Sequence, residues 1–158
     1  MENPPRKMAL IASKGTLDMA YPPLILATTA AALGYEVRIF FTFYGLQLLR
    51  KDLGHIRISP LANPAMPMPV PMPVMVSALP GMEAMATMMM KQKIKKHGVA
   101  SLEELRDLCL EADVKLIACQ MTIDLFEFDK SEFIAGIDYG GAATFLEFAG
   151  QADITLFI

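Results

Sequence analysis

Two kinds of hydrophobic pattern alternate along this chain, and together they predict strands alternating with helices. Short apolar runs typical of buried strands lie at 8–12, 36–43, 114–118 and 153–158. Longer segments with apolar residues at helical spacing lie at 19–33, 44–51, 82–97, 101–112 and 140–150. Strands that alternate with helices in this order indicate an α/β fold.

The expected architecture is a three-layer α/β/α domain with a mainly parallel sheet of about five strands. Parallel strands need crossover connections, and the helical segments supply them. Four strands are clear, and the segments 74–77 and 133–137 are candidates for further short ones. No internal repeat or linker divides residues 1–158, so we expect a single domain.

Local signals predict where individual helices begin. Ser101 precedes a helical segment and Glu104 follows three residues later, which is the pattern of a capping box. Pro22 and Pro23 fit only the first turn of a helix, where a missing N–H does no harm. We therefore expect the first helix to begin near Met19.

A proline- and methionine-rich segment from Ile58 to Met82 breaks the alternation. It contains seven prolines and no charged residue, and nine of the 13 methionines lie between Met66 and Met90. Its length suits a membrane span, but alternating prolines remove too many backbone donors for a regular helix in lipid. We expect an extended apolar insertion at about 58–82, in which residues 60–82 contact a partner, another copy of the chain or a membrane surface.

Composition excludes several classes of function. A net charge of −3 and one short basic stretch at 91–96 provide no extended positive surface for nucleic acid. His55 and His97 have no partner at metal-ligand spacing, so we expect neither a metal nor another cofactor. Two cysteines are too few for a disulfide framework and no secretory signal is visible, so we expect a cytoplasmic protein with reduced thiols.

The main candidate for chemistry is Cys119, which directly follows the predicted strand at 114–118. Ligands of open parallel sheets bind beyond the carboxyl ends of the strands. A helical turn is expected just after Cys119, and a thiolate at the start of a helix is stabilised by the helix dipole. The alternative is a buried and inert cysteine, which is the commoner fate of a lone cysteine after a strand.

Cys109 and the loop after the first strand are further candidates. Cys109 shares an apolar helical stripe with leucines, and it is either a core residue or a second thiol within reach of Cys119. Lys14, Gly15 and Asp18 lie in the loop, where the lysine would favour an anionic sulfur species and the glycine would let the backbone approach a ligand. The alternative is an ordinary turn with a solvated lysine.

Segments 13–18 and 116–122, with the Pro/Met-rich segment between them, resemble the DsrE/DsrF-like family, in particular its peroxiredoxin-related branch. The resemblance extends over nearly the whole chain. It implies a DsrE-like α/β/α fold and a cytoplasmic sulfur-relay role. Cys119 matches the cysteine that carries sulfane sulfur as a persulfide or thiosulfonate. Cys109 matches a second cysteine that is common in this branch.

The resemblance therefore implies a sulfur carrier, similar to a sulfurtransferase, that forms a homo-oligomer. Its donors and acceptors would be rhodanese-like and TusA-like proteins. Cys119 would be the reactive thiol, and Cys109 would store, relay or release the sulfur. The residues expected to bind the substrate are Lys14, Gly15, Asp18, Gln120, Met121 and Thr122.

Two other functions are compatible with the same residues. A thiol–disulfide regulator would form a bond between Cys109 and Cys119 under mild oxidation. A non-catalytic interaction module would use the Pro/Met-rich segment and would tolerate the loss of Cys119. The sequence also leaves open whether the protein turns over as an enzyme or acts as a stoichiometric carrier.

Overall fold

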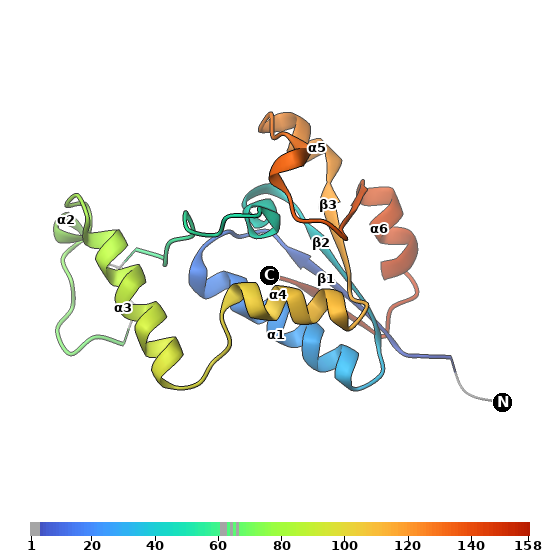
Figure 1. The fold of residues 1–158 in the computed structure, drawn as a ribbon, viewed down its shortest axis with the longest axis horizontal. Helices are drawn as coiled ribbons and strands as arrows, with labels where there is room; N and C mark the ends of the chain where they lie inside the picture. The colour runs from blue at the N-terminus through green and yellow to red at the C-terminus, as the bar shows by residue number, and fades with distance from the viewer. Residues whose placement is uncertain (1–3, 61–62, 64, 66) are drawn as a thin grey trace.

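A computed structural model of the chain describes residues 4–60, 63, 65 and 67–158. Five parallel strands form one sheet in the order β4-β3-β2-β1-β5. The strands are β1 (Lys7–Ala12), β2 (Glu36–Phe41), β3 (Lys115–Cys119), β4 (Asp138–Gly140) and β5 (Ile154–Phe157). The carboxyl ends of all five therefore meet at one edge, and the predicted parallel α/β sheet is confirmed (Figure 1).

Helices cover both faces of the sheet. Helices α1 (Leu17–Ala32) and α4 (Leu102–Glu111) pack together on one face, and α6 (Ala142–Ala149) covers the other (Figure 1). Strand residues alternate between the faces, so the core has two parts. The larger cluster lies under α1 and α4, and the smaller one, in which the rings of Phe40 and Phe145 stack at 5.2 Å, lies under α6.

Helix α4 begins with the predicted capping box. The Ser101 hydroxyl accepts a bond from the Glu104 N–H at 3.1 Å, and the Glu104 carboxylate accepts one from the Ser101 N–H at 2.7 Å. The prediction for the prolines of α1 is wrong, because the helix begins at Leu17 and both Pro22 and Pro23 lie inside it. Pro23 is fully buried, and this packing offsets the lost backbone bond.

The Pro/Met-rich segment contains α2 (Val74–Ser77) and ends at the start of α3 (Met82–Lys96), and both helices project from the body of the protein (Figure 1). The candidate strand at 74–77 is therefore a helix. The candidate strand at 133–137 is also wrong, because the strand in this part of the chain is β4, at Asp138–Gly140. Leu61, Ala62, Pro64 and Met66 lie outside the described residues. Within the part of the chain that the structure describes, no helix combines the length and apolarity needed to cross a membrane.

Short helices fill the loops at the carboxyl edge. The segment after β2 forms the 3₁₀ helix η1 (Phe43–Leu49) instead of the expected α-helix, and β3 leads directly into α5 (Gln120–Leu125). A further 3₁₀ turn, η2 (Lys130–Glu132), precedes β4.

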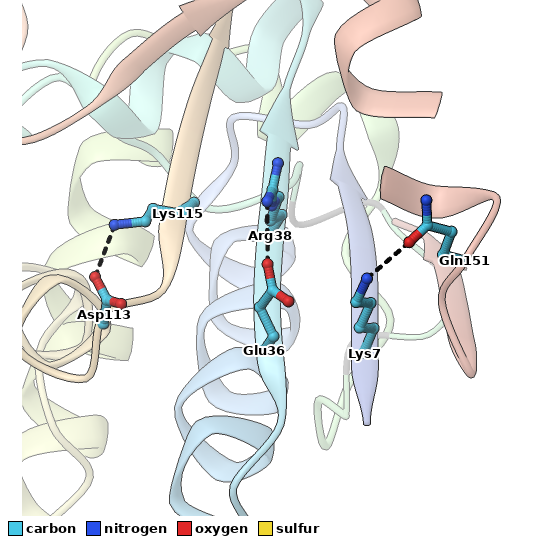
Figure 2. Close-up of polar contacts among 6 residues, drawn as sticks. All are labelled: Lys7, Glu36, Arg38, Asp113, Lys115 and Gln151. Atoms are coloured by element: carbon cyan, nitrogen blue, oxygen red, sulfur yellow. Dashed lines mark hydrogen bonds and ion pairs between the residues drawn. The ribbon is translucent and has the colours of Figure 1, made fainter. Parts of the chain in front are cut away.

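Charged side chains gather at the opposite, amino-terminal end of the central strands. Figure 2 shows three polar pairs there, Lys7 with Gln151, Glu36 with Arg38, and Asp113 with Lys115. Lys115 begins β3, whereas Cys119 ends it. The basic residues of the central strands therefore lie away from the edge that holds Cys119.

Candidate functional site

Cys119 is the last residue of β3 and lies between the loops that follow β2 and β3. Its side chain belongs to the smaller core cluster, and only 4% of the residue is exposed. Beyond the strand end the neighbours of the thiol are polar and include the hydroxyls of Thr42 and Thr122, which lower its pKa. The thiol is thus almost covered, but it faces hydrogen-bond donors as well as apolar side chains.

These contacts favour the ionised form of Cys119. Burial raises the pKa of the thiol, but hydrogen bonds from the Thr122 side chain and N–H, from the Thr42 side chain and from the Met121 N–H outweigh it. The pKa therefore lies below its ordinary value. The thiolate is the nucleophilic form of cysteine, so this arrangement suits attack on sulfur.

Thr122 organises the site. It is completely buried, and its hydroxyl accepts a hydrogen bond from the Phe43 N–H at 3.1 Å. The hydroxyls of Thr122 and Thr42 lie 3.3 Å apart. The Phe43 N–H uses only a lone pair of the Thr122 hydroxyl, so the proton of this hydroxyl can be donated to the sulfur of Cys119 or to the Thr42 hydroxyl. Phe43 has a φ of 46°, a conformation rare outside glycine, and the bond to Thr122 helps to hold it there.

We expect Thr122→Val to slow alkylation of Cys119 by iodoacetamide about fivefold at pH 7, since one hydrogen bond contributes roughly 1 kcal/mol. The variant should also lose about 1–3 kcal/mol of unfolding free energy, because the Phe43 N–H loses its acceptor. The control is Thr87→Val. Thr87 is also buried and accepts the Ile58 N–H at 3.0 Å, so this change should destabilise the fold without altering the alkylation rate. Equal alkylation rates for the two variants would contradict the proposed role of Thr122.

The loop after β1 packs against the loop after β2, which borders the site. A Cβ added to Gly15 would lie 2.4 Å from the Tyr44 carbonyl oxygen, and one added to Gly45 would lie 2.0 Å from the Ala12 carbonyl oxygen. The close approach expected at Gly15 therefore joins two backbone segments, not a backbone and a ligand. Lys14 is exposed at this same edge of the sheet.

Asp18 anchors the start of the Pro/Met-rich segment. Its carboxylate accepts hydrogen bonds from the Ser59 N–H at 3.0 Å and from the Ser59 hydroxyl at 2.7 Å. Burial raises the pKa of Asp18, but the bonds from Ser59 outweigh it and lower the pKa below 3.8. The geometry assigns Asp18 a structural contact, and nothing in it directs the carboxylate to the thiol.

We expect Asp18→Asn to weaken this anchor and to speed cleavage of the 58–82 segment by thermolysin at pH 7. Because the folded-state pKa is lowered, the contribution of Asp18 is complete above 3.8 and is lost as the pH falls through the lower folded value. Hydrogen exchange extends the comparison to low pH. The difference in exchange rate of this segment between Asp18→Asn and the wild type should therefore disappear in strong acid. The control is Asp107→Asn, which changes an exposed acid on α4, and this variant should be cleaved at the wild-type rate.

Gln120 forms its contact through the side chain, whereas Met121 acts through its backbone N–H. The Gln120 amide donates to the Asp124 carboxylate at 2.7 Å, which fixes that side chain along α5. The Met121 N–H bonds to the sulfur of Cys119, while the Met121 side chain is 59% exposed. Of the residues 120–122, Met121 and Thr122 thus act on the thiol from the first turn of α5, and Gln120 does not.

Cys109 lies on α4, in the larger cluster on the other face of the sheet from Cys119. It is fully buried, its thiol donates to the Leu24 carbonyl at 3.9 Å, and burial raises its pKa to about 12. Both cysteines are free thiols. The structure does not bring the two together, so its geometry gives no support to a relay or a disulfide between them.

The sequence reasoning missed Thr42 and Phe43. The predicted strand at 36–43 extends through both residues, whereas β2 ends at Phe41 and the chain then turns. The available signal was a threonine directly after an apolar run, at the edge where ligands of parallel sheets bind. In the described part of the chain, no group of three or more His, Cys, Asp or Glu side chains is placed to hold a metal ion.

Comparison with known proteins finds two relatives and one protein that shares the fold. The sulfur carrier protein DsrE2 of Allochromatium vinosum is 64% identical over 157 residues, covering 97% of this chain and 98% of that protein. The uncharacterized protein YrkE of Bacillus subtilis is 33% identical over 159 residues, covering 97% of both. The crystal structure of the ychN protein from E. coli shares the fold, with a TM-score of 0.61 at 12% identity over 97% of this chain and 99% of that one.

The family model agrees with these relatives. The model of the DsrE/DsrF/DrsH-like family matches residues 4–157, nearly the full length of the chain. The DsrE-like fold expected from the sequence is thereby confirmed. The chain belongs to the DsrE/DsrF/DrsH-like family.

Proposed function

We propose that this protein is a sulfur carrier that holds sulfane sulfur on Cys119 and passes it to another protein thiol. The observation that carries the proposal is the lowered pKa of Cys119, caused by hydrogen bonding from Thr122, Thr42 and Met121, which favours the thiolate. The 64% identity to a protein named as a sulfur carrier supports it independently.

The transfer needs no external oxidant. The Cys119 thiolate attacks the outer sulfur of a donor persulfide, R–S–SH. A new S–S bond forms on Cys119, the donor S–S bond breaks, and its electron pair leaves with R–S⁻. The product is Cys119–S–SH, and the reverse reaction with an acceptor thiolate unloads it. Hydrogen bonds that stabilise the thiolate also stabilise the persulfide anion.

A thiosulfonate forms by the same chemistry. When the thiolate attacks an inner sulfur of tetrathionate, the central S–S bond breaks and thiosulfate leaves with the electron pair. Cys119–S–S–SO₃⁻ remains, with its charge at the edge that also holds the exposed Lys14. Rhodanese-like donors and TusA-like acceptors in the cytoplasm fit this chemistry, and a homo-oligomer is the proposed working form.

The test is peptide mass spectrometry after incubation with polysulfide or tetrathionate. We expect a polysulfur or thiosulfonate adduct on the peptide that contains Cys119. Adding a second carrier with a reduced thiol should move the sulfur to that carrier. An unmodified Cys119, in a sample in which a rhodanese loads normally, would contradict the proposal.

A second role, as an interaction module that binds a membrane or another copy of the chain, is favoured by a hollow beside α3. Six methionines line a space of about 350 Å³ together with Ile58 and Lys93, namely Met68, Met72, Met82, Met85, Met89 and Met90. Flexible thioethers suit adaptable binding surfaces. This role predicts that deleting residues 60–80 abolishes association of the protein with vesicles or with its own copies, whereas Cys119→Ser leaves association unchanged. Vesicle flotation and size-exclusion chromatography measure the two cases.

A further inference from the structure

We infer that the apolar face beside Cys119 docks the protein that exchanges sulfur with it, and that this partner carries a basic rim around its own thiol. We call this face the rim patch. It consists of five exposed side chains from the loops after β2 and β3, Phe43, Tyr44, Met121, Leu125 and Phe126. The inference rests on the proposed function, because it assigns the surface through which the sulfur would arrive and leave.

The rim patch is continuous with the hydrogen-bond network of the thiol. The Met121 N–H bonds to the sulfur of Cys119, and the Phe43 N–H bonds to the hydroxyl of Thr122. The side chains of Met121 and Phe43 are 59% and 43% exposed. Cys119 itself is only 4% exposed, so a partner that exchanges sulfur with it has to contact the surface around the thiol, to which these two residues belong.

Three aromatic rings give the patch a defined shape. The ring centroids of Phe43 and Tyr44 lie 6.5 Å apart, those of Phe43 and Phe126 lie 6.4 Å apart, and Tyr44 stacks on Phe126 at 6.1 Å. Rings that pack on one another in the free protein lose little entropy on binding. Exposed aromatic residues and methionine are also the residue types enriched at the centre of protein interfaces.

The exposed charges on the α5 side of the patch are acidic. Residues 116–129 contain three acidic residues and no basic one, and the acidic side chains of Asp124, Glu127 and Asp129 are all exposed. Two exposed cations lie nearby, Lys14 on the other side of the edge and Lys130, whose ammonium group lies 4.5 Å from the centre of the Tyr139 ring. Arg50 is paired with Glu132, so its charge is offset. The α5 side of the patch therefore presents negative charge to an approaching protein.

The negative charge of the α5 side distinguishes between the partners that could bind an apolar face. A second copy bound through the same face would bring two acidic rims together, and an anionic membrane would be repelled in the same way. A protein with basic residues around an apolar centre fits both features. Opposite charges also speed the encounter of such partners.

The experiment uses two peptides that carry a cysteine as a mixed disulfide with thionitrobenzoate. Each has leucines beside the cysteine, with arginines outside them in one peptide and glutamates in the other. We expect the arginine peptide to react with Cys119 about tenfold faster at low salt, and the advantage to shrink at 1 M salt, where screening is nearly complete. Neutral 4,4′-dithiodipyridine reports the intrinsic reactivity of the thiol in every sample.

Matched variants locate the effect. Asp124→Asn with Glu127→Gln should remove most of the arginine advantage, whereas Asp107→Asn with Glu111→Gln on α4 should keep it. Tyr44→Ala should slow the arginine peptide at least about threefold and leave the dithiodipyridine rate unchanged. Equal rates for the two peptides with the wild type, or an unchanged advantage in the Asp124/Glu127 variant, would overturn the inference. Polysulfide loading is measured separately, so a failure of the carrier function is distinguishable from a failure of the docking face.

Discussion

Cys119→Ser is expected to abolish loading with polysulfide or tetrathionate, whereas Cys109→Ala is expected to load like the wild type. The reason is the difference in ionisation of the two thiols. Burial raises the pKa of Cys109 to about 12, so only about 10⁻⁵ of it is thiolate at pH 7. Hydrogen bonds lower the pKa of Cys119 below 9.0 despite its burial. Peptide mass spectrometry of both variants measures the loading.

The pH dependence provides a second readout of the same prediction. The loading rate of Cys119 should rise as the pH rises through its pKa, because the thiolate is the reacting form, and it should level off at a lower pH than the rate of an unperturbed cysteine thiol. Cys109 should remain unmodified over this range in the folded protein and react only after unfolding. Cys109→Ala removes a buried sulfur, so a loss of about 1 kcal/mol of stability is expected without a loss of loading.

Two results would contradict this assignment. Loading that persists in Cys119→Ser would show that the reactive atom is not the sulfur of Cys119. Loading that disappears in Cys109→Ala, while circular dichroism shows a folded protein, would restore Cys109 as a functional thiol despite its position on the other face of the sheet. A Cys109–Cys119 bond after mild oxidation would support the thiol–disulfide regulator.

Most of the fold follows from the sequence because its signals are local. The apolar runs at 8–12 and 114–118 become β1 and β3 within a residue at either end, and the Ser101–Glu104 pattern forms the expected cap. The register and the order β4-β3-β2-β1-β5 do not follow, since they depend on contacts between distant segments. The candidate strand at 74–77 also shows that a short apolar run does not distinguish strand from helix.

The site is only partly predictable for the same reason. The position of Cys119 at the strand end follows from one segment of sequence. The hydroxyl of Thr42, which bonds to its sulfur, comes from a loop about 80 residues earlier. Likewise, a spacing of ten residues makes Cys109 and Cys119 look close, but the helix and strand that carry them direct the two thiols into different clusters. Such placements depend on which face of the sheet each element covers.

Gly45→Ala is expected to destabilise the protein by about 4 kcal/mol or more, a large share of the stability of a domain of this size. An added Cβ would lie 2.0 Å from the carbonyl oxygen of Ala12 and 2.6 Å from its carbonyl carbon. Ala12 ends β1, which is paired on both sides, so this backbone has little freedom to move away. Urea unfolding of the variant measures the loss.

Gly141→Ala is the matched control, because a Cβ at that position meets nothing within 4 Å and should change stability by about 1 kcal/mol at most. The effect of Gly45→Ala should also reach the thiol. Gly45 lies in η1, directly after Phe43 and Tyr44, so a displaced η1 would pull the Phe43 N–H away from Thr122. Any folded fraction of the variant should then alkylate more slowly at Cys119. A Gly45→Ala protein as stable and as reactive as Gly141→Ala would show that the two loops do not pack as described, and the donor arrangement around the sulfur would lose its basis.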